Sequence, residues 1–164
     1  MITDTDKIHL QRCVALAAEA VEAGDSPFGS VLVSGSGEVL REDRNRVNSV
    51  EPTYHPELAL AKWAAENMTQ AQRSEAVVYT SGEHCAMCSA AHAWAGLGRI
   101  VYISSSQQLQ QWQQEQGIQA DSPINSLSIN EVAPDIKAEG PVAGFDEQVK
   151  ALHQRVWQQR TSKV

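Results

Sequence analysis

The chain has 164 residues, a formal net charge of −7 and 42% hydrophobic residues. This length fits one domain with a sizeable core, and no apolar run approaches the roughly 18 to 20 residues that a membrane helix needs. The acidic balance argues against a partner bound through many phosphates, such as a nucleic acid. Three cysteines, and an N-terminus without a signal-peptide pattern, favour a reducing, cytoplasmic environment with no membrane association.

The N-terminal part of the chain predicts one amphipathic helix followed by a β-hairpin. Apolar residues between positions 10 and 21 recur at helical spacing, with Asp6 as the candidate N-cap and Gly24 as the end of the helix. Two short β-prone runs, 28–33 and 38–42, are separated by the turn sequence SGSG. They indicate two strands joined by a tight turn.

The middle of the chain predicts a helix, a strand, a helix and a strand. Segment 56–68 is rich in helix formers, and Pro56 suits a first helical turn, where its missing N–H would have no partner anyway. An apolar run at 76–80 precedes a helical segment at 86–96, and a second apolar run follows at 99–103. Strand, helix and strand in this order imply a parallel pair with a crossover helix.

The C-terminal part of the chain gives weaker signals. The glutamine-rich segment 104–117 predicts a surface helix rather than a low-complexity tract. Segment 124–132 alternates like an edge strand, and 138–144 is expected to be a loop. A last helix, at about 146–160, carries apolar residues on one face. No linker divides the chain, so a single α/β domain over residues 1–164 is expected.

Two of the three cysteines lie three residues apart in the stretch TSGEHCAMCSAAHAW. A Cys-x-x-Cys pair can be a redox dithiol, half of a structural zinc site or part of a catalytic metal centre. Cys85 and Cys88 lie at the start of the third predicted helix, where the positive end of the helix dipole favours thiolate over thiol. This position makes metal binding easier, but the pair alone leaves the three alternatives open.

His55 and Glu57 lie two residues apart at the start of the second predicted helix. One imidazole and two thiolates make three protein ligands, and a catalytic zinc site leaves its fourth position for water. If the two helix starts meet, His55, Cys85 and Cys88 surround one ion. Glu57 can then stand beside the water without ligating the metal and accept its proton. A purely structural zinc site has no need of such a carboxylate.

Four segments together identify a family: SPFGSVLV, NRVNSVEPTYHPE, VVYTSGEHCAMC and GRIVYIS. Over about residues 8–103 the chain resembles the cytidine deaminase-like superfamily, in the branch that holds guanine deaminases, cytosine deaminases and tRNA adenosine deaminases. The resemblance implies a cytidine deaminase-like α/β fold, a three-layer α/β/α sandwich with a mixed five-stranded sheet. It also implies a zinc-dependent hydrolase that deaminates an amino-substituted ring.

The resemblance also implies a role for each residue of the motif. His55, Cys85 and Cys88 match the residues that bind Zn2+ in the family. Glu57 matches the proton shuttle, which takes a proton from the zinc-bound water, protonates a ring nitrogen and then protonates the departing ammonia.

Three further residues are expected to contact the substrate. Asn45 matches an asparagine that hydrogen-bonds the substrate in the family, and Phe28 matches a residue that lines the base pocket. The PFG around Phe28 resembles guanine deaminases more than tRNA-editing enzymes, and guanine deaminases also carry tryptophan at the position of Trp94. His84 stands where the family usually has proline. It is expected to be a substrate contact, a group close to the zinc that does not ligate it, or a loop histidine facing solvent.

The expected substrate is a small molecule, a purine base or nucleoside such as guanine, with cytosine, cytidine or a pterin-type ring as alternatives. A tRNA adenosine deaminase is disfavoured by the chain's acidity and by the pattern around Phe28. A structural zinc module or a dithiol redox protein is the alternative outside deamination. In guanine deaminases the C-terminal segment helps to close the active site, so the helix at about 146–160 is expected to do the same. A homodimer is expected on family grounds.

Overall fold

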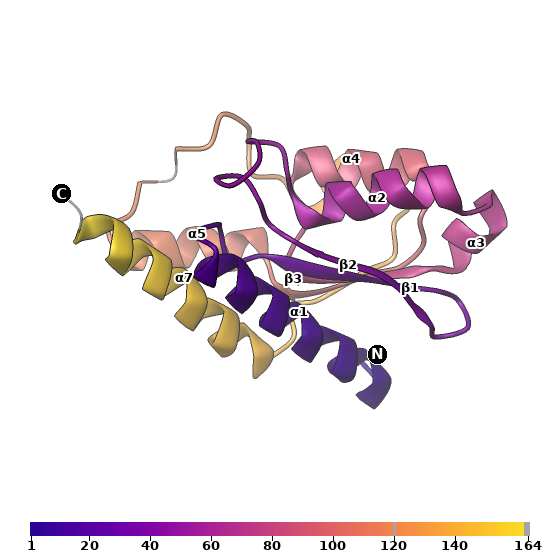
Figure 1. The fold of residues 1–164 in the computed structure, drawn as a ribbon, viewed down its shortest axis with the longest axis horizontal. Coiled ribbons are helices and arrows are strands. Elements are labelled where there is room, and N and C mark those ends of the chain that lie inside the picture. Colours follow the sequence, from indigo (N-terminus) through magenta and orange to yellow (C-terminus); the bar gives the residue numbers. More distant parts are fainter. Residues whose placement is uncertain (120, 163–164) are drawn as a thin grey trace.

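The computed structural model describes residues 1–119 and 121–162 (Figure 1). The elements are α1 (Asp4–Glu22), β1 (Gly29–Val33), β2 (Val39–Arg44), α2 (Pro56–Asn67), α3 (Gln70–Glu75), β3 (Val77–Gly82), α4 (Ala86–Ala95), β4 (Ile100–Ser104), α5 (Ser106–Glu115), α6 (Ile129–Val132), β5 (Ala138–Glu139) and α7 (Phe145–Thr161). Among the described residues, no helix combines the length and the apolar content that crossing a membrane requires.

A mixed five-stranded sheet forms the middle of the fold, in the order β2-β1-β3-β4-β5. β1 pairs antiparallel with β2, which confirms the predicted hairpin, and it also pairs antiparallel with β3. β3 and β4 are parallel and are connected through α4, which confirms the predicted crossover unit. The short β5 adds a second parallel pair at the edge beside β4.

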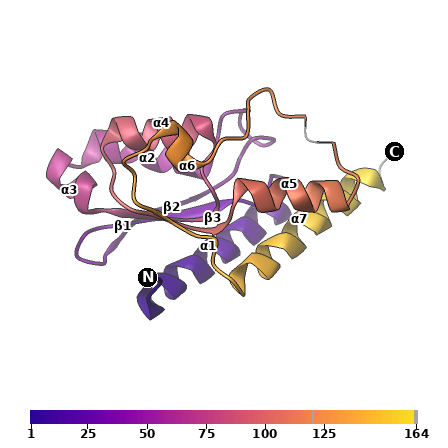
Figure 2. The same cartoon turned by 180° about the vertical axis from the view of Figure 1, so that it is seen from behind.

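Helices cover both faces of this sheet. α1, α5 and α7 lie on one face, and α2 and α4 lie on the other (Figures 1 and 2). Each face has its own apolar core. On one face, α1, α5 and α7 pack against alternate residues of β1, β3 and β4. On the other face, α2 packs against Leu32 of β1 and Val78 of β3. This arrangement is the predicted three-layer α/β/α sandwich. It explains why all five residues of β1 are buried.

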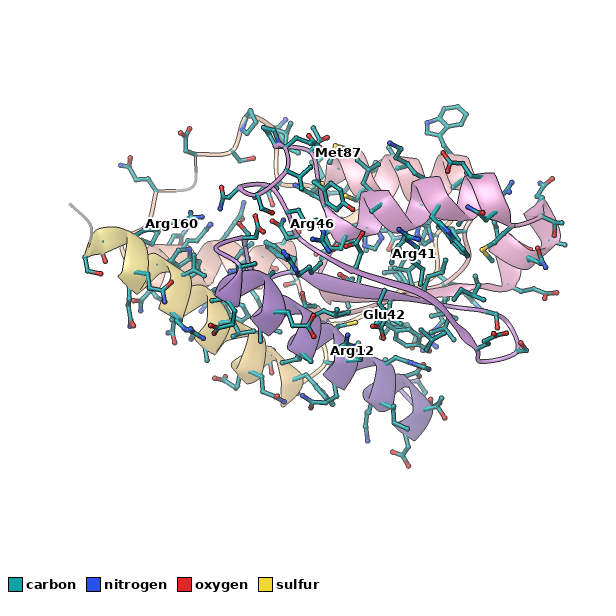
Figure 3. The ribbon with its side chains drawn as sticks, in the orientation of Figure 1. Arg12, Arg41, Glu42, Arg46, Met87 and Arg160 are labelled. Atoms are coloured by element: carbon teal, nitrogen blue, oxygen red, sulfur yellow. The ribbon has the colours of Figure 1, made fainter. Side chains whose placement is uncertain are left out.

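The edge strand β2 is tied to α1 through charged side chains. Arg12 of α1 donates to Glu42 of β2, with 2.8 Å between Nη2 and Oε2, and the two side chains point toward one another in Figure 3. The remaining guanidinium nitrogens reach Glu42 again and Glu19. β2 lies at the edge of the sheet and pairs with β1 alone among the strands. The ion pair between Arg12 and Glu42 therefore gives this edge strand a second attachment.

The N-cap of α1 is Thr3, so the prediction of Asp6 in that role is wrong. The Thr3 hydroxyl accepts from the Asp6 N–H at 3.1 Å, and the Asp6 carboxylate accepts from the Thr3 N–H at 2.8 Å. This is a reciprocal capping box, in which the carboxylate stands three residues after the cap. Asp6 also accepts hydrogen bonds from Tyr79 and Arg99, which join α1 to the sheet.

Two predictions for the C-terminal part of the chain are also wrong. Segment 124–132 is not an edge strand, because α6 begins at Ile129 after a turn in which Glu131 Oε2 accepts from both Ser128 N and Ser128 Oγ at 2.7 Å. The Ser-x-x-Glu spacing outweighs the alternating pattern there. Segment 138–144, expected to be a loop, begins with β5, which pairs with β4.

Candidate active site

The starts of α2 and α4 bring the three metal-ligand candidates together. His55 is the N-cap of α2 and is followed by Pro56, whose ring favours a first helical turn. Cys85 is the N-cap of α4, and Cys88 lies three residues further on, on the same side of the helix. The predicted meeting of the two helix starts is therefore confirmed.

The spacing of the three ligand atoms fits one zinc ion. His55 Nδ1 lies 3.5 Å from Cys85 Sγ and 3.5 Å from Cys88 Sγ, and all three atoms lie within 4.8 Å of one another. A tetrahedral ion with Zn–S distances of about 2.3 Å and Zn–N distances of about 2.0 to 2.1 Å separates its N and S ligands by about 3.6 Å. The donors thus match zinc in type, number and spacing.

The charges at this cluster favour metal binding. Hydrogen bonding with Cys88, and then with His55, lowers the pKa of the Cys85 thiol to about 4. The pKa of Cys88 is raised, first by its hydrogen bonding with Cys85 and second by burial. The hydrogen bond with Cys85 raises the pKa of His55. The cluster therefore offers a thiolate at neutral pH, the form that binds a metal ion.

Glu57 lies beside the cluster and is almost fully buried. Its Oε1 accepts from Thr80 Oγ1 at 2.8 Å, and its Oε2 lies 3.7 Å from Cys88 Sγ. Burial raises the pKa of the Glu57 carboxyl above its usual value. A carboxyl with a raised pKa accepts a proton more readily than an ordinary glutamate.

A cavity of about 290 Å³ opens onto Glu57, His55 and Cys85. Phe28 and Asn45 line it, together with residues of α5 and of segment 121–127. Among the residues that the structure describes, no lysine or arginine lines this cavity. The lining mixes apolar side chains such as Phe28 and Leu109 with polar and acidic ones, which suits an uncharged heterocycle.

Asn45 presents a hydrogen-bond donor to the cavity. Its Oδ1 accepts from the Val47 N–H at 3.0 Å and from the Ser26 N–H at 3.4 Å. Because both partners are backbone donors, they require the oxygen on their side, and the NH2 group is the part left for a ligand. The substrate atom that faces Asn45 is therefore expected to be an acceptor, such as a carbonyl oxygen or a ring nitrogen.

Phe28 forms one wall of the cavity and is supported from behind. A Cβ at Gly82 would lie 2.9 Å from Phe28 Cε1, so glycine is needed there to make room for the ring. His153 of α7 packs edge-on against Phe28, with 5.1 Å between ring centroids. No described residue of α7 lines the cavity. Closure of the active site by the helix at about 146–160 stays a prediction.

His84 neither faces solvent nor lines the cavity. Its side chain is 1% exposed, it does not line the cavity, and both ring nitrogens lack hydrogen-bond partners in the described structure. The ring packs against His92 at 5.4 Å, and burial lowers the pKa of His84, so the imidazole is a neutral packing group. The expected substrate contact is therefore corrected. Trp94 is 89% exposed on α4 and also lies outside the cavity.

Glu83 is a cavity residue that sequence reasoning missed. Its Oε2 accepts from the Ser106 N–H at 2.8 Å and its Oε1 from the Ile129 N–H at 3.0 Å. One carboxylate thus holds the starts of α5 and α6, between which segment 121–127 lines the cavity. The two partners are 23 and 46 residues away, and no local pattern reveals contacts at that range.

The family model described as "Cytidine and deoxycytidylate deaminase zinc-binding region" matches residues 3–104. The chain belongs to this deaminase family. The matched segment includes the whole metal cluster and Glu57. It follows that this deaminase is a hydrolase acting on C–N bonds and that zinc is its cofactor. A structural zinc module and a dithiol redox protein are thereby set aside.

Two curated relatives and one solved structure illustrate what the deaminase is similar to. It is 29% identical to a "Probable cytosine deaminase" of Schizosaccharomyces pombe over 78% of either chain. It is 38% identical to a "Guanine deaminase" of Bacillus subtilis over 58% of its own length and 62% of the relative's. The solved guanine deaminase from Nitrosomonas europaea matches its fold with a TM-score of 0.69 at 18% identity, over 95% of this chain and 85% of that one.

Proposed function

We propose that this deaminase acts on a small amino-substituted heterocycle, with a purine base or nucleoside such as guanine as the first candidate. The observation that carries the proposal is the shared cavity. Glu57, Asn45 and two of the three metal-ligand candidates, His55 and Cys85, line the same space of about 290 Å³. Proton transfer, substrate orientation and water activation can therefore act on one ring.

His55, Cys85 and Cys88 are the residues proposed to hold the zinc ion. When bound there, zinc would supply Lewis-acid activation of a water molecule. Glu57 is the proposed proton carrier, with Oε2 on the side of the cluster and Oε1 held by Thr80. Asn45 donates to an acceptor atom of the ring, and Phe28 packs against the ring.

The reaction balances as a hydrolysis. The oxygen of one water molecule bonds to the amine-bearing carbon, and the bond from that carbon to the amino nitrogen breaks. Glu57 accepts one proton of the water and passes it to the adjacent ring nitrogen. The second proton of the water travels by the same carboxylate to the departing amine, which leaves as ammonia. The ring is left with a carbonyl group and a protonated ring nitrogen.

The absence of cations from the described cavity lining supports a substrate without phosphate. Glu83 and Asp121 are acidic, and no described lysine or arginine faces the cavity to bind a phosphate group. A free base or a nucleoside is therefore favoured over a nucleotide and over tRNA. Guanine stands ahead of cytosine, cytidine and pterin-type rings because of the pattern around Phe28 and the similarity to the Bacillus subtilis guanine deaminase.

An ammonia-release screen tests the proposal. Zinc-loaded protein is incubated with free bases, nucleosides, nucleotides, pterins and tRNA at matched concentrations. We expect ammonia from a purine base, with guanine first, and little or none from the corresponding nucleotides. Faster turnover of a nucleotide or of tRNA, or no ammonia from any compound, would overturn the proposed substrate class.

We also propose that the protein is a homodimer and that it works in the reducing environment of the cytoplasm. The reducing compartment is supported by the chemistry of the cluster, because Cys85 and Cys88 must stay unoxidised to hold a metal ion. The dimer is supported by family resemblance. A mass measurement in solution tests it, and a monomer at micromolar concentration would contradict it.

A further inference from the structure

Two buried hydroxyl groups lie beneath the Glu57 carboxylate. Ser30 of β1 and Thr80 of β3 are both 0% exposed, and they are direct partners in the antiparallel pairing of the two strands. Strand alternation places them on the same face as Leu32 and Val78, which pack against α2. Because Glu57 lies in the first turn of α2, both hydroxyls are brought under its side chain.

The distances allow a hydrogen-bond chain that ends on Glu57, which is the nearer of the two acceptors of the Thr80 hydroxyl; the other is the Gly82 carbonyl oxygen at 3.1 Å. Thr80 Oγ1 lies 2.8 Å from Glu57 Oε1, and Ser30 Oγ lies 2.9 Å from Thr80 Oγ1. A hydroxyl has one proton to donate. When Thr80 donates to Glu57, Ser30 can donate to Thr80, and each proton has an acceptor. Ser30 Oγ also lies 3.2 Å from Glu57 Oε1, so its single proton can go to that oxygen instead of to Thr80.

The two oxygens of Glu57 therefore have different surroundings. Oε1 is held by hydroxyl groups that belong to the rigid centre of the sheet. Oε2 lies on the side of the metal cluster, 3.7 Å from Cys88 Sγ. A carboxylate that must transfer protons efficiently has to keep one oxygen in a fixed place relative to the reacting atoms.

We propose that Ser30 and Thr80 are positioning residues for the deamination reaction, which hold Glu57 by Oε1 and leave Oε2 as the oxygen that transfers protons. The inference rests on the proposed function of Glu57. Thr80 has the larger effect because it touches the carboxylate at the shorter distance, and Ser30 acts mainly through Thr80.

A merely structural role would give a different result. Buried hydroxyls need partners wherever they lie, so their loss can lower stability without touching the reaction. Ser81 provides a matched control, because it is equally buried in β3 but its Oγ accepts from the Gly29 N–H instead of contacting Glu57. Ser81→Ala should lower stability and leave kcat unchanged.

The test compares Thr80→Val, Thr80→Ser, Ser30→Ala and Ser81→Ala, each loaded with zinc and corrected for zinc content. We expect Thr80→Val to lower kcat about tenfold or more with KM within about twofold of wild type, since a hydrogen bond to a charged group is lost. Thr80→Ser should restore kcat to within about threefold, and Ser30→Ala should give a smaller loss. Equal kcat for Thr80→Val and wild type, or an equal loss for Ser81→Ala, would overturn the inference.

A crystal structure of Thr80→Val supplies a readout that does not depend on activity. The Glu57 carboxylate should rotate or lose its single position in Thr80→Val and keep it in Thr80→Ser. An unchanged carboxylate in Thr80→Val would overturn the inference even if the substrate remained unknown. Failure of the proposed function looks different: wild-type protein would release no ammonia from any compound, while the crystallographic comparison would still decide the positioning role.

Discussion

Cys88 Sγ and Glu57 Oε2 lie 3.7 Å apart, so the most deeply buried metal-ligand candidate is in contact with the candidate proton carrier. Cys88 is fully buried and reaches this contact from the first turn of α4. Glu57 reaches it from the first turn of α2. Two side chains in contact are thus expected to have separable functions, one for the metal and one for the proton.

Metal content should separate these two functions. Cys88→Ala removes one of three ligands, so we expect it to lose zinc and to unfold at a lower temperature than the wild-type protein, because metal binding is coupled to folding. Glu57→Ala leaves the three ligands intact and should keep about one zinc per chain. Elemental analysis of freshly purified variants makes the comparison. Equal zinc content in both variants would contradict the proposed ligand set.

Asn45→Asp should impair substrate binding while preserving the local backbone. The new carboxylate can still accept from the Val47 and Ser26 N–H groups, as Asn45 Oδ1 does. Its other oxygen replaces the NH2 donor and repels an acceptor atom on the substrate. We expect kcat/KM to fall at least about tenfold with zinc content unchanged, measured on the compound found in the ammonia screen. Wild-type kcat/KM in this variant would show that Asn45 does not donate to the substrate.

Glu83 variants should change KM in a graded way. Glu83→Gln keeps one acceptor oxygen and loses the other, whereas Glu83→Ala loses both contacts, to Ser106 and to Ile129. Segment 121–127 should then be held less firmly over the cavity. We expect KM to rise in the order wild type, Gln, Ala, with unchanged zinc content. Identical KM values for the three proteins would rule out a role of this carboxylate in placing the cavity wall.

His153 should make the protein less stable in mild acid. Burial among Phe28, Trp112 and Trp157 lowers the pKa of His153 to about 3, whereas an unfolded histidine titrates near 6.5. Between these two pH values, His153 binds a proton in the unfolded state but not in the folded state. The free energy of unfolding is therefore highest above about pH 6.5 and falls as the pH drops below it.

Urea unfolding of wild type and His153→Leu at pH 7.5 and 5.5 measures this contribution. Between pH 7.5 and 5.5 the free energy of unfolding should fall by about 1 kcal/mol more in wild type than in the variant, because His153→Leu has no group to protonate at that site. An equal loss in the two proteins would show that His153 does not carry the acid sensitivity.

The metal site could be predicted from the sequence because its determinants are local. The spacing of His55 and Glu57, the Cys-x-x-Cys pair and Pro56 in a first turn each place side chains at a helix start, and the crossover unit then brings the helix starts together. The hairpin and the parallel pair were predictable for the same reason, since turn residues and apolar runs lie next to one another in the chain.

The parts that were missed depend on contacts between distant residues. Glu83 reaches partners 23 and 46 residues away, and β5 is a strand of two residues that exists only because β4 pairs with it. The place of His84 in the motif left open whether the ring contacts the substrate, lies near the zinc or faces solvent; the ring packs inward against His92. A position in a motif predicts the course of the backbone. It does not predict which way a side chain points when the residue differs from the one usual in the family.

The most direct test of the central claim is the rate of ammonia release by Glu57→Gln, measured on the best substrate and at the same zinc content as wild type. Glutamine keeps the shape of the side chain but can neither accept nor return the proton. We predict a loss of at least about 100-fold in kcat. Release of ammonia by Glu57→Gln at the wild-type rate would contradict the assignment of Glu57 as the proton carrier and, with it, this account of the site.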